Sequence, residues 1–261
     1  MSNVICSWKG AVLFVGKLPD LEFHSTVTSA VVVGLDSDIK KRVRGNSDWM
    51  RSRCFVFDGR LNHETTWKGN VGILFADPGS PIGTLLSNEA GRKGLSSDPV
   101  WTSKLIRSCE QVLYTTTYPN SFDGHFLLGE KKVSETNSGY DERLIRVLRW
   151  IVQNPDETIN IQKLAYKAGM SPSWLQHEFR NTIGIPIRAF RKWFRVKRAA
   201  LALNGGSSFV DAALGAGFYD QSHFTNVFRE IFGISPSAVF SKNEPIRWNV
   251  MDEHLSIVDI Y

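Results

Sequence analysis

The sequence contains an imperfect internal repeat, which constrains the fold more than any other feature. The first copy is IQKLAYKAGMSPSWLQHEFRNTIGIP at 161–186, and the second is FVDAALGAGFYDQSHFTNVFREIFGISP at 209–236. Each copy has a helical pattern, a turn that contains glycine and a second, capped helical pattern. The repeat therefore predicts two helix-turn-helix units. With one extra residue in the second turn, the corresponding positions are Ala168 and Ala216, Gly169 and Gly217, Phe179 and Phe228, and Gly184 and Gly233.

The second helix of the second copy is unusual because short polar side chains stand at its start. Gly217 is suited to end the preceding helix, and Asp220 is suited to cap the next one. Apolar residues then recur at steps of three and four, which predicts one buried face. These residues are Phe224, Val227, Phe228 and Ile231. The outer side carries hydrogen-bonding groups of the kind that can read base edges in a DNA major groove.

The charge distribution supports the same reading. Residues 141–240 hold 13 basic and 8 acidic side chains, a net charge of +5. The whole chain also has a net charge of +5, so the positive excess lies in this segment. The segment RAFRKWFRVKR at 188–198 is basic, aromatic and helical in pattern, which indicates nucleic-acid binding. A merely solvated helix face is the alternative. We expect helices at 160–168, 172–182, 186–204, 208–216, 220–231 and 235–241, after an amphipathic helix that follows Asp141.

Residues 141–241 resemble the DNA-binding domain of the AraC/XylS family of bacterial transcription regulators. The residues that carry the resemblance in the second copy are Ala213, Gly217, Phe218, Asp220, Gln221, Ser222, Phe224, Phe228, Phe232, Gly233 and Pro236. The first copy adds Leu164, Ala165, Ala168, Met170, Ser171, Leu175, Phe179, Gly184, Arg195 and Ala199. His177 departs from the family, which commonly has Arg there. The resemblance implies a DNA-binding regulator of the bacterial cytoplasm that works with RNA polymerase and is often dimeric.

The resemblance also implies how DNA is bound. The helices at 172–182 and 220–231 should enter successive major grooves about 34 Å apart, one turn of B-DNA. The expected base readers are Ser173, Trp174, Gln176 and His177 in the first copy, and Gln221, Ser222, His223, Thr225 and Asn226 in the second. The expected phosphate contacts are Arg180, Arg188, Arg191, Lys192, Arg195 and Arg229. Arg195 could equally be an internal ion-pair partner.

The amino-terminal half has the character of a β domain. AVLFVG, STVTSAVVVGL, RCFVFDG and VGILFADPG read as short strands between turns, which predicts a sandwich or barrel. Three segments resemble, more faintly, the reduced cupin-like sensor domain found in one branch of the same family: FHSTVTSAVVVGLD, RCFVFDGRLNHET and ILFADPGSPIG. A helix is expected at 99–113, with a stripe of Val100, Leu105, Cys109 and Val112. This stripe should pack on its own domain, although it could pair with a second protomer.

Catalytic and metal-binding motifs are not evident in the sequence. His24 stands alone and His63 has only Glu64 beside it, and neighbours on a strand point to opposite faces. We therefore expect no metal and no cofactor, and a structural or pocket-lining role for His63. The three cysteines, Cys6, Cys54 and Cys109, are too widely spaced for a disulfide framework or a Cys-rich zinc site. We expect no enzymatic activity and no membrane segment.

The segment KKRVRGNSDWMRSR at 40–53 is a candidate ligand site. If it folds as two strands, Arg42 and Arg44 share one face, and Arg51 and Arg53 share another. Converging guanidinium groups could hold a carboxylate or phosphate, with Trp49 or Trp67 stacked on a ring. An alternative is a solvated β edge, where basic residues deter pairing with other edges. If binding survives the loss of Arg42 and Arg44, the ligand site is expected inside the β fold near His63. Some relatives of this type respond to cyclic dinucleotides or to small organic acids.

These observations predict a two-domain α+β protein. We assign residues 1–136 to a cupin-like β sandwich or barrel with helices, which senses a ligand and dimerises. We assign 137–243 to an all-α double helix-turn-helix DNA-binding domain and 244–261 to a carboxy-terminal tail. The expected function is a cytoplasmic, sequence-specific transcription regulator, an activator, controlled by an anionic effector such as a cyclic dinucleotide. The alternatives are an architectural DNA binder without effector and a cupin-type enzyme fused to a DNA-binding module.

Overall fold

A computed structural model describes residues 2–8, 10–57, 59, 61–93, 99–114, 140–155, 159–240 and 246–250. These residues form two compact units. The β-rich unit contains the described residues that precede residue 135, together with those from Phe228 onward. The helical unit contains those from Tyr140 to Val227. The α+β class predicted from the sequence is confirmed.

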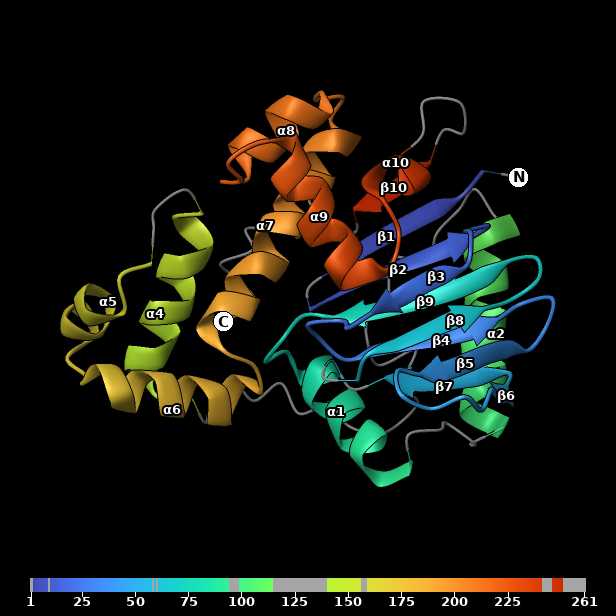
Figure 1. Ribbon diagram of the computed structural model, residues 1–261, viewed down its shortest axis with the longest axis horizontal. Coiled ribbons are helices and arrows are strands. Elements are labelled where there is room, and N and C mark those ends of the chain that lie inside the picture. Colours follow the sequence, from blue (N-terminus) through green and yellow to red (C-terminus); the bar gives the residue numbers. More distant parts are fainter. Residues whose placement is uncertain are drawn as a thin grey trace. The chain divides into compact units, whose positions relative to one another are not determined.

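The β-rich unit contains two sheets (Figure 1). Its strands are β1 (Val4–Trp8), β2 (Ala11–Gly16), β3 (Leu21–His24), β4 (Ala30–Gly34), β5 (Ile39–Val43), β6 (Met50–Ser52), β7 (Cys54–Phe57), β8 (His63–Thr66), β9 (Val71–Ala76) and β10 (Arg247–Val250). The larger sheet has the order β10-β1-β2-β9-β4-β7, and the smaller has the order β3-β8-β5-β6. All pairs are antiparallel except β1 with β10, which is parallel.

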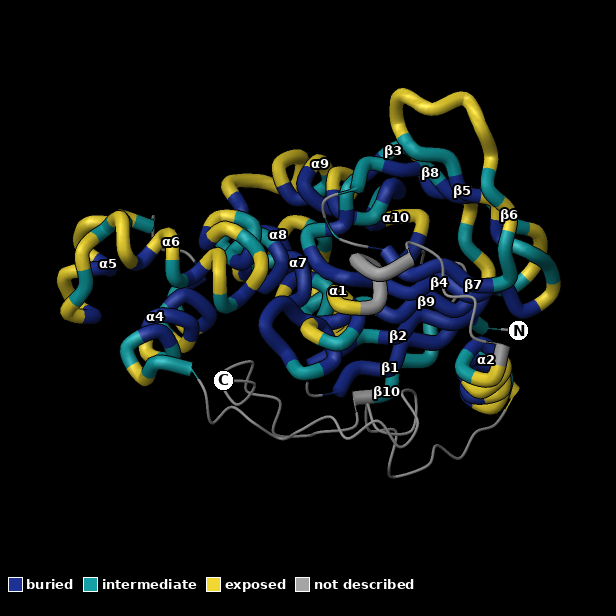
Figure 2. Tube along the Cα trace, turned by 90° about the horizontal axis from the view of Figure 1, so that it is seen from below, coloured by how far each residue is buried: buried dark blue, intermediate teal, exposed yellow. Residues whose placement is uncertain are grey.

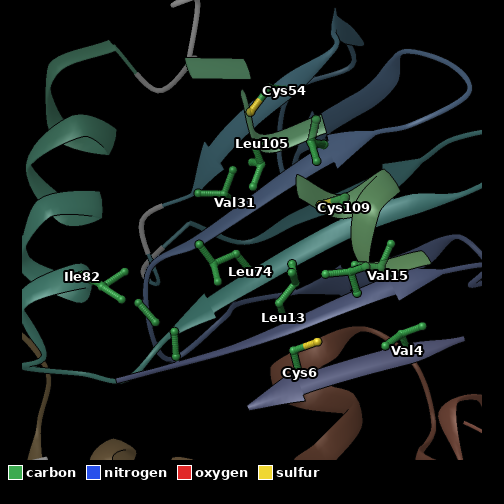
Figure 3. Close-up of a cluster of buried hydrophobic side chains, with 14 of the residues drawn as sticks. Val4, Cys6, Leu13, Val15, Val31, Cys54, Leu74, Ile82, Leu105 and Cys109 are labelled. Atoms are coloured by element: carbon green, nitrogen blue, oxygen red, sulfur yellow. The ribbon is translucent and has the colours of Figure 1, made fainter. Parts of the chain in front are cut away.

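Two helices, α1 (Pro81–Lys93) and α2 (Pro99–Tyr114), pack against the larger sheet and close a hydrophobic core (Figures 1 and 3). Leu105, Cys109 and Val112 of α2 meet residues of the sheet in that core. α2 approaches β9 so closely that a Cβ on Gly72 would lie 2.5 Å from the Cys109 Sγ. The prediction that this helix packs on its own domain is therefore confirmed.

The predicted apolar stripe on α2 was wrong at one residue. Val100 is 64% exposed, whereas the other three residues are buried. The reason is helical geometry, because Val100 and Leu105 are five residues apart and so point in directions about 140° apart. The three cysteines are buried and free. Burial raises the pKa of the Cys6 thiol to about 12, so this thiol is unreactive.

The helical unit begins with α4 (Glu142–Gln153) and continues with α5 (Ile161–Ala168), α6 (Pro172–Ile183), α7 (Ile187–Asn204) and α8 (Phe209–Gly215). α9 (Gln221–Phe232) follows, and its first seven residues belong to this unit. The predicted amphipathic face of α4 is buried, from Leu144 to Val152. Figure 2 shows the strands of the larger sheet mostly in dark blue, whereas α5 and α6 carry many exposed residues. No helix in the described part of the chain combines the length and apolar character needed to cross a membrane.

The carboxy-terminal end of the repeat belongs to the β-rich unit. Phe228–Phe232 of α9, the short helix α10 (Pro236–Val239) and β10 all lie there. Phe232 packs edge-on against Phe75 of β9, with ring centroids 5.0 Å apart. The boundaries predicted from the sequence differ from those of the two units. The predicted DNA-binding domain spans 137–243 and the predicted tail spans 244–261, and the residues at these boundaries lie outside the described part of the chain. β10, within the predicted tail, extends the larger sheet.

Candidate DNA-binding surface

The first helix-turn-helix is built from local capping interactions. The Asn160 side chain accepts a hydrogen bond from the Lys163 N–H and caps α5, and Gly169 ends α5 in the left-handed conformation. Ser171 then caps α6 by accepting from the Trp174 N–H, with Pro172 at the first helical position. Leu175, Phe179 and Ile183 are buried on one face of α6. This packing leaves the opposite face of α6 free to contact a ligand.

The exposed face of α6 carries the residues predicted from the sequence. Ser173, Trp174, Gln176, His177 and Arg180 are all exposed. The guanidinium of Arg143, on α4, lies 4.9 Å from the centre of the Trp174 ring, and Arg143 is itself paired with Asp141. The Trp174 ring is therefore held in place, although the residue is 37% exposed.

Sequence reasoning missed one residue of this face. Asn181 is exposed, and its Nδ2 lies 3.1 Å from the His177 Nδ1. The two side chains form a pair of donors and acceptors one helical turn apart. The signal in the sequence was the spacing of four residues, which places both on the same side of a helix. His177 therefore retains hydrogen-bonding capacity at a position where the family that the sequence resembles commonly has Arg.

The second helix-turn-helix repeats the plan with a stronger cap. Ser208 caps α8 by accepting from the Asp211 N–H, and its hydroxyl donates to the Asp211 carboxylate. Gly217 has a φ of 82° in the turn. The Asp220 Oδ1 accepts from the His223 N–H at 2.6 Å. Asp220 is thus a cap, and its carboxylate also interacts favourably with the positive end of the helix dipole.

The outer face of α9 presents most of the predicted readers. Gln221, Ser222 and Asn226 are exposed, and Thr225 is half-buried. His223 differs, because its Nδ1 accepts a hydrogen bond from the Tyr219 N–H and its ring packs edge-on against Phe218. This residue stabilises the turn, so its availability to DNA is lower than that of its neighbours.

The predicted cationic contacts fall into two groups. Arg180, Arg188 and Arg229 are exposed and Lys192 is half-buried. Arg191 and Arg195, by contrast, both donate to the backbone carbonyl of Pro155, with Arg191 Nη2 and Arg195 Nε at 2.9 and 2.8 Å. Arg195 also lies 5.9 Å from the centre of the Phe218 ring. These two guanidinium groups therefore fasten α7 to the segment after α4.

The structure brings three of the six predicted ligand residues, Arg42, Arg44 and Trp49, close to one aromatic ring or to each other. Arg42 is paired with Glu64 and lies between the Phe23 and Trp49 rings, 5.6 and 4.8 Å from their centres. Arg44 lies 5.2 Å from the same Phe23 ring, and its Nε donates to the Asn62 side chain.

Three of the predicted ligand residues lie apart from this pair. Arg51 is bound to Asp38, and Arg53 donates to the Leu35 carbonyl. His63 is buried within the β-rich unit, where its ring lies 4.5 Å from that of His24. Among the described residues, no group of three or more His, Cys, Asp and Glu side chains is suited to hold a metal ion.

Comparison with known proteins identifies the repeat. Residues 164–242 match a family model described as a helix-turn-helix domain. The regulator MtrA of Neisseria gonorrhoeae is 30% identical over 97 residues, which cover 37% of this chain and 32% of MtrA. The arabinose operon regulatory protein of Escherichia coli is 33% identical over 100 residues, 37% of this chain and 34% of that protein. The chain thus spans about a third of the length of each, and both are transcription regulators, not enzymes.

Solved structures extend the likeness to the β-rich unit. ToxT from Vibrio cholerae aligns with 89% of this chain and 98% of its own, at a TM-score of 0.56 and 13% sequence identity. At this identity the likeness concerns the fold alone. The predicted combination of an amino-terminal cupin-like unit with a carboxy-terminal helix-turn-helix region is confirmed at that level.

Proposed function

We propose that this chain belongs to the AraC/XylS family of transcription regulators, that it binds promoter DNA in a sequence-specific manner and that a small anionic effector modulates this binding. The observation that carries the proposal is the pair of capped helices, α6 and α9, each with one buried face and one face of exposed hydrogen-bonding groups. Side chains of these types match the donors and acceptors of base edges in the major groove. The basic residues around them supply phosphate contacts.

Binding should be bipartite. The connecting helix α7 has 18 residues and is therefore about 27 Å long, so it is long enough to separate the two readers by a large part of a helical turn of DNA. We propose that Ser173, Trp174, Gln176 and His177 read one major groove, and that Gln221, Ser222, Thr225 and Asn226 read the next. Arg180, Arg188, Lys192 and Arg229 contact phosphates.

A footprint of the full chain on a DNA fragment selected for binding to it tests this. The expected result is two protected major-groove segments on one face of the DNA, about 34 Å apart. Protection confined to one groove would refute bipartite binding. The full chain is preferable to the fragment 141–241, because the end of α9 packs within the β-rich unit.

For the effector, we propose an organic anion that binds at the outer face of the smaller sheet. Arg42 and Arg44 lie beside the same Phe23 ring, and Trp49 covers Arg42, so a charged group and a planar ring could both be held. One solved ToxT structure is described as bound to an unsaturated fatty acid and another to a substituted butenoic acid, and both ligands are carboxylates. More specifically, we propose a cyclic dinucleotide as the effector, because it combines phosphate groups with aromatic rings.

Calorimetry with organic acids and cyclic dinucleotides tests the effector site. Binding should weaken at least tenfold in an Arg42→Ala/Arg44→Ala variant. Lys41→Met is the matched control, because the Lys41 side chain comes from the same strand, β5, but is buried. Binding that survives the double substitution but is lost in Lys41→Met would place the effector inside the β fold near His63.

The remaining parts of the proposal rest on the family alone. We propose that the chain acts in the cytoplasm as an activator that contacts RNA polymerase, and that it forms a homodimer through its amino-terminal half. Sedimentation tests the dimer, since a monomer at high concentration with and without DNA would contradict it. An architectural DNA binder remains the alternative function. It predicts that no metabolite alters either melting temperature or DNA affinity.

A further inference from the structure

The carboxy-terminal end of α9 is joined to the edge strand β3. The Glu22 N–H donates to the Gly233 carbonyl at 3.1 Å, and the Ser25 N–H donates to the Glu230 carbonyl at 3.4 Å. An edge strand has N–H groups without a partner strand, and a helix end has carbonyls without a partner in the helix. Here these N–H groups of β3 and these carbonyl groups of α9 form hydrogen bonds with each other. We call this contact the α9 seat, made of Glu22–Ser25, Glu230, Phe232 and Gly233.

Gly233 is the tightest point of the seat. Its φ is 72°, and a Cβ at this position would lie 2.7 Å from both the Glu22 carbonyl oxygen and the His24 Nδ1. Gly184, the corresponding residue in the first copy, has a similar φ of 85°, but a Cβ there would meet nothing within 4 Å. The left-handed conformation explains both glycines, whereas the close approach exists only in the second copy.

The histidine that touches Gly233 belongs to a buried polar cluster. The His24 ring lies 4.5 Å from the His63 ring, which stacks on Phe57 at 4.0 Å. The Lys41 Nζ lies 4.6 and 5.1 Å from the centres of the Phe55 and Phe57 rings. Lys41 is only 3% exposed and both histidines are fully enclosed. Two imidazoles and one ammonium group thus share an aromatic interior.

The hydrogen bonds of the two rings define their neutral form. The His24 Nδ1 lies 2.8 Å from the Glu22 carbonyl oxygen, and the His63 Nδ1 lies 2.8 Å from the Leu61 carbonyl oxygen. Because a carbonyl only accepts, each Nδ1 carries the proton in the neutral ring. A second proton, on the other nitrogen, would place a positive charge inside the cluster.

The surroundings oppose that charge. Burial lowers the pKa of His24 despite hydrogen bonds to the Glu22 and His63 backbone. Burial, together with the electrostatic opposition of the His24 ring and of Lys41 to a second positive charge, lowers the pKa of His63 to about 3. Of the described residues packed around the pair, Lys41 is the charged side chain that β5 contributes, and β7 contributes the Phe55 and Phe57 rings. The nearby side chains of Glu22, Arg229 and Glu230 are exposed.

We propose that the α9 seat is a proton-sensitive latch: it holds the end of the second recognition helix while His24 is neutral and releases it when His24 is protonated. In the released state His24 is solvated and titrates near its ordinary pKa of about 6.5. The seat therefore has its full stability above this value and loses stability progressively as the pH falls below it, because protons bind the released state preferentially. At pH 5.5, one unit below, the released fraction rises about tenfold.

Hydrogen exchange of the full chain tests the latch without DNA, so failure of the proposed function would leave the test intact. We would compare protection factors, which correct for the intrinsic pH dependence, at pH 7.5 and pH 5.5 for segments 21–26 and 228–234. The expected result is an approximately tenfold loss of protection in both segments, with β2 and β9 unchanged. In His24→Gln the loss should vanish, because the Gln amide can donate to the Glu22 carbonyl but does not titrate.

The repeat supplies a matched pair of variants. Gly233→Ala and Gly184→Ala both force Ala into the left-handed conformation, so their common cost is the backbone strain. Only Gly233→Ala should expose segment 21–26 to exchange at pH 7.5. The latch is refuted if the wild type keeps its protection at pH 5.5, or if His24→Gln loses protection to the same degree. Equal exchange of 21–26 in the two glycine variants would also overturn it, including in the case that His24→Gln does not fold.

Discussion

The two helix-turn-helix copies share local geometry but differ in what surrounds their second helices. α6 is capped by Ser171 and ends at Gly184, where a side chain would meet open space. α9 is capped by Asp220 and ends at Gly233, against β3. A duplicated motif therefore reproduces capping and the buried face, because these depend on residues a few positions apart. It does not reproduce the tertiary surroundings. Under the proposed latch the position of α9 depends on pH, whereas the end of α6 lacks the close approach that β3 makes to Gly233.

The largest expected effect comes from the equivalent phenylalanines of the two copies. Phe179 packs edge-on against Phe190 in the helical unit, whereas Phe228 packs with Phe232 and Phe240 in the β-rich unit. Removing either ring should lower the free energy of unfolding by about 3–5 kcal/mol. Hydrogen exchange should show loosening of α6 and α7 in Phe179→Ala, but of α10 and segment 21–26 in Phe228→Ala. Identical exchange patterns would contradict the division of α9 between the units.

The base readers should give the next largest effect. Gln176→Ala and Asn226→Ala each remove an exposed amide, one from each copy, and should cost about 1–3 kcal/mol of binding to the cognate site. Discrimination should be lost over one half of the site in the first variant and over the other half in the second. Binding measured against a library of single base-pair changes would show this. Asn181→Ala is the informative control, because it tests whether His177 requires its neighbour.

The two caps should have effects of about 1 kcal/mol. Ser171→Ala removes an acceptor for the Trp174 N–H, and Asp220→Ala removes one for the His223 N–H. Each substitution should destabilise its helix by about 1 kcal/mol. Asp220→Ala should cost more than Ser171→Ala, because the carboxylate also interacts with the helix dipole. Equilibrium denaturation measures the difference, and Asp220→Asn, which retains a capping oxygen, should recover most of the loss.

The smallest expected effect concerns the cations of α7. Arg188 is exposed, so Arg188→Ala should weaken DNA binding for all sequences and reduce the slope of log K against log salt concentration by about 0.9. Arg195→Ala should leave that slope unchanged but lower the melting temperature, because the Pro155 carbonyl loses donors. An unchanged slope in Arg188→Ala would remove it from the phosphate contacts.

The candidate surface could be largely predicted from the sequence. The six helices of the repeat region were placed within about two residues, and the buried face of α9 was assigned correctly. The reason is that Ser171, Gly169 and Asp220 act on their own helix, so their pattern along the chain carries the information. Partners from other segments could not be predicted. Arg191 and Arg195 bind the Pro155 carbonyl, 36 and 40 residues away in the sequence.

Less of the β-rich unit could be predicted from the sequence. Composition and alternation identified it as a β fold, because burial of one sheet face dictates which residues are apolar. The order of its strands, the addition of β10 beside β1 and the meeting of His24 with His63 were decided by tertiary structure. These depend on contacts between residues tens to hundreds of positions apart, for which a single sequence has no periodic signal. Gly233 belongs to both categories: the sequence required glycine to end a helix, and the fold placed that glycine against His24.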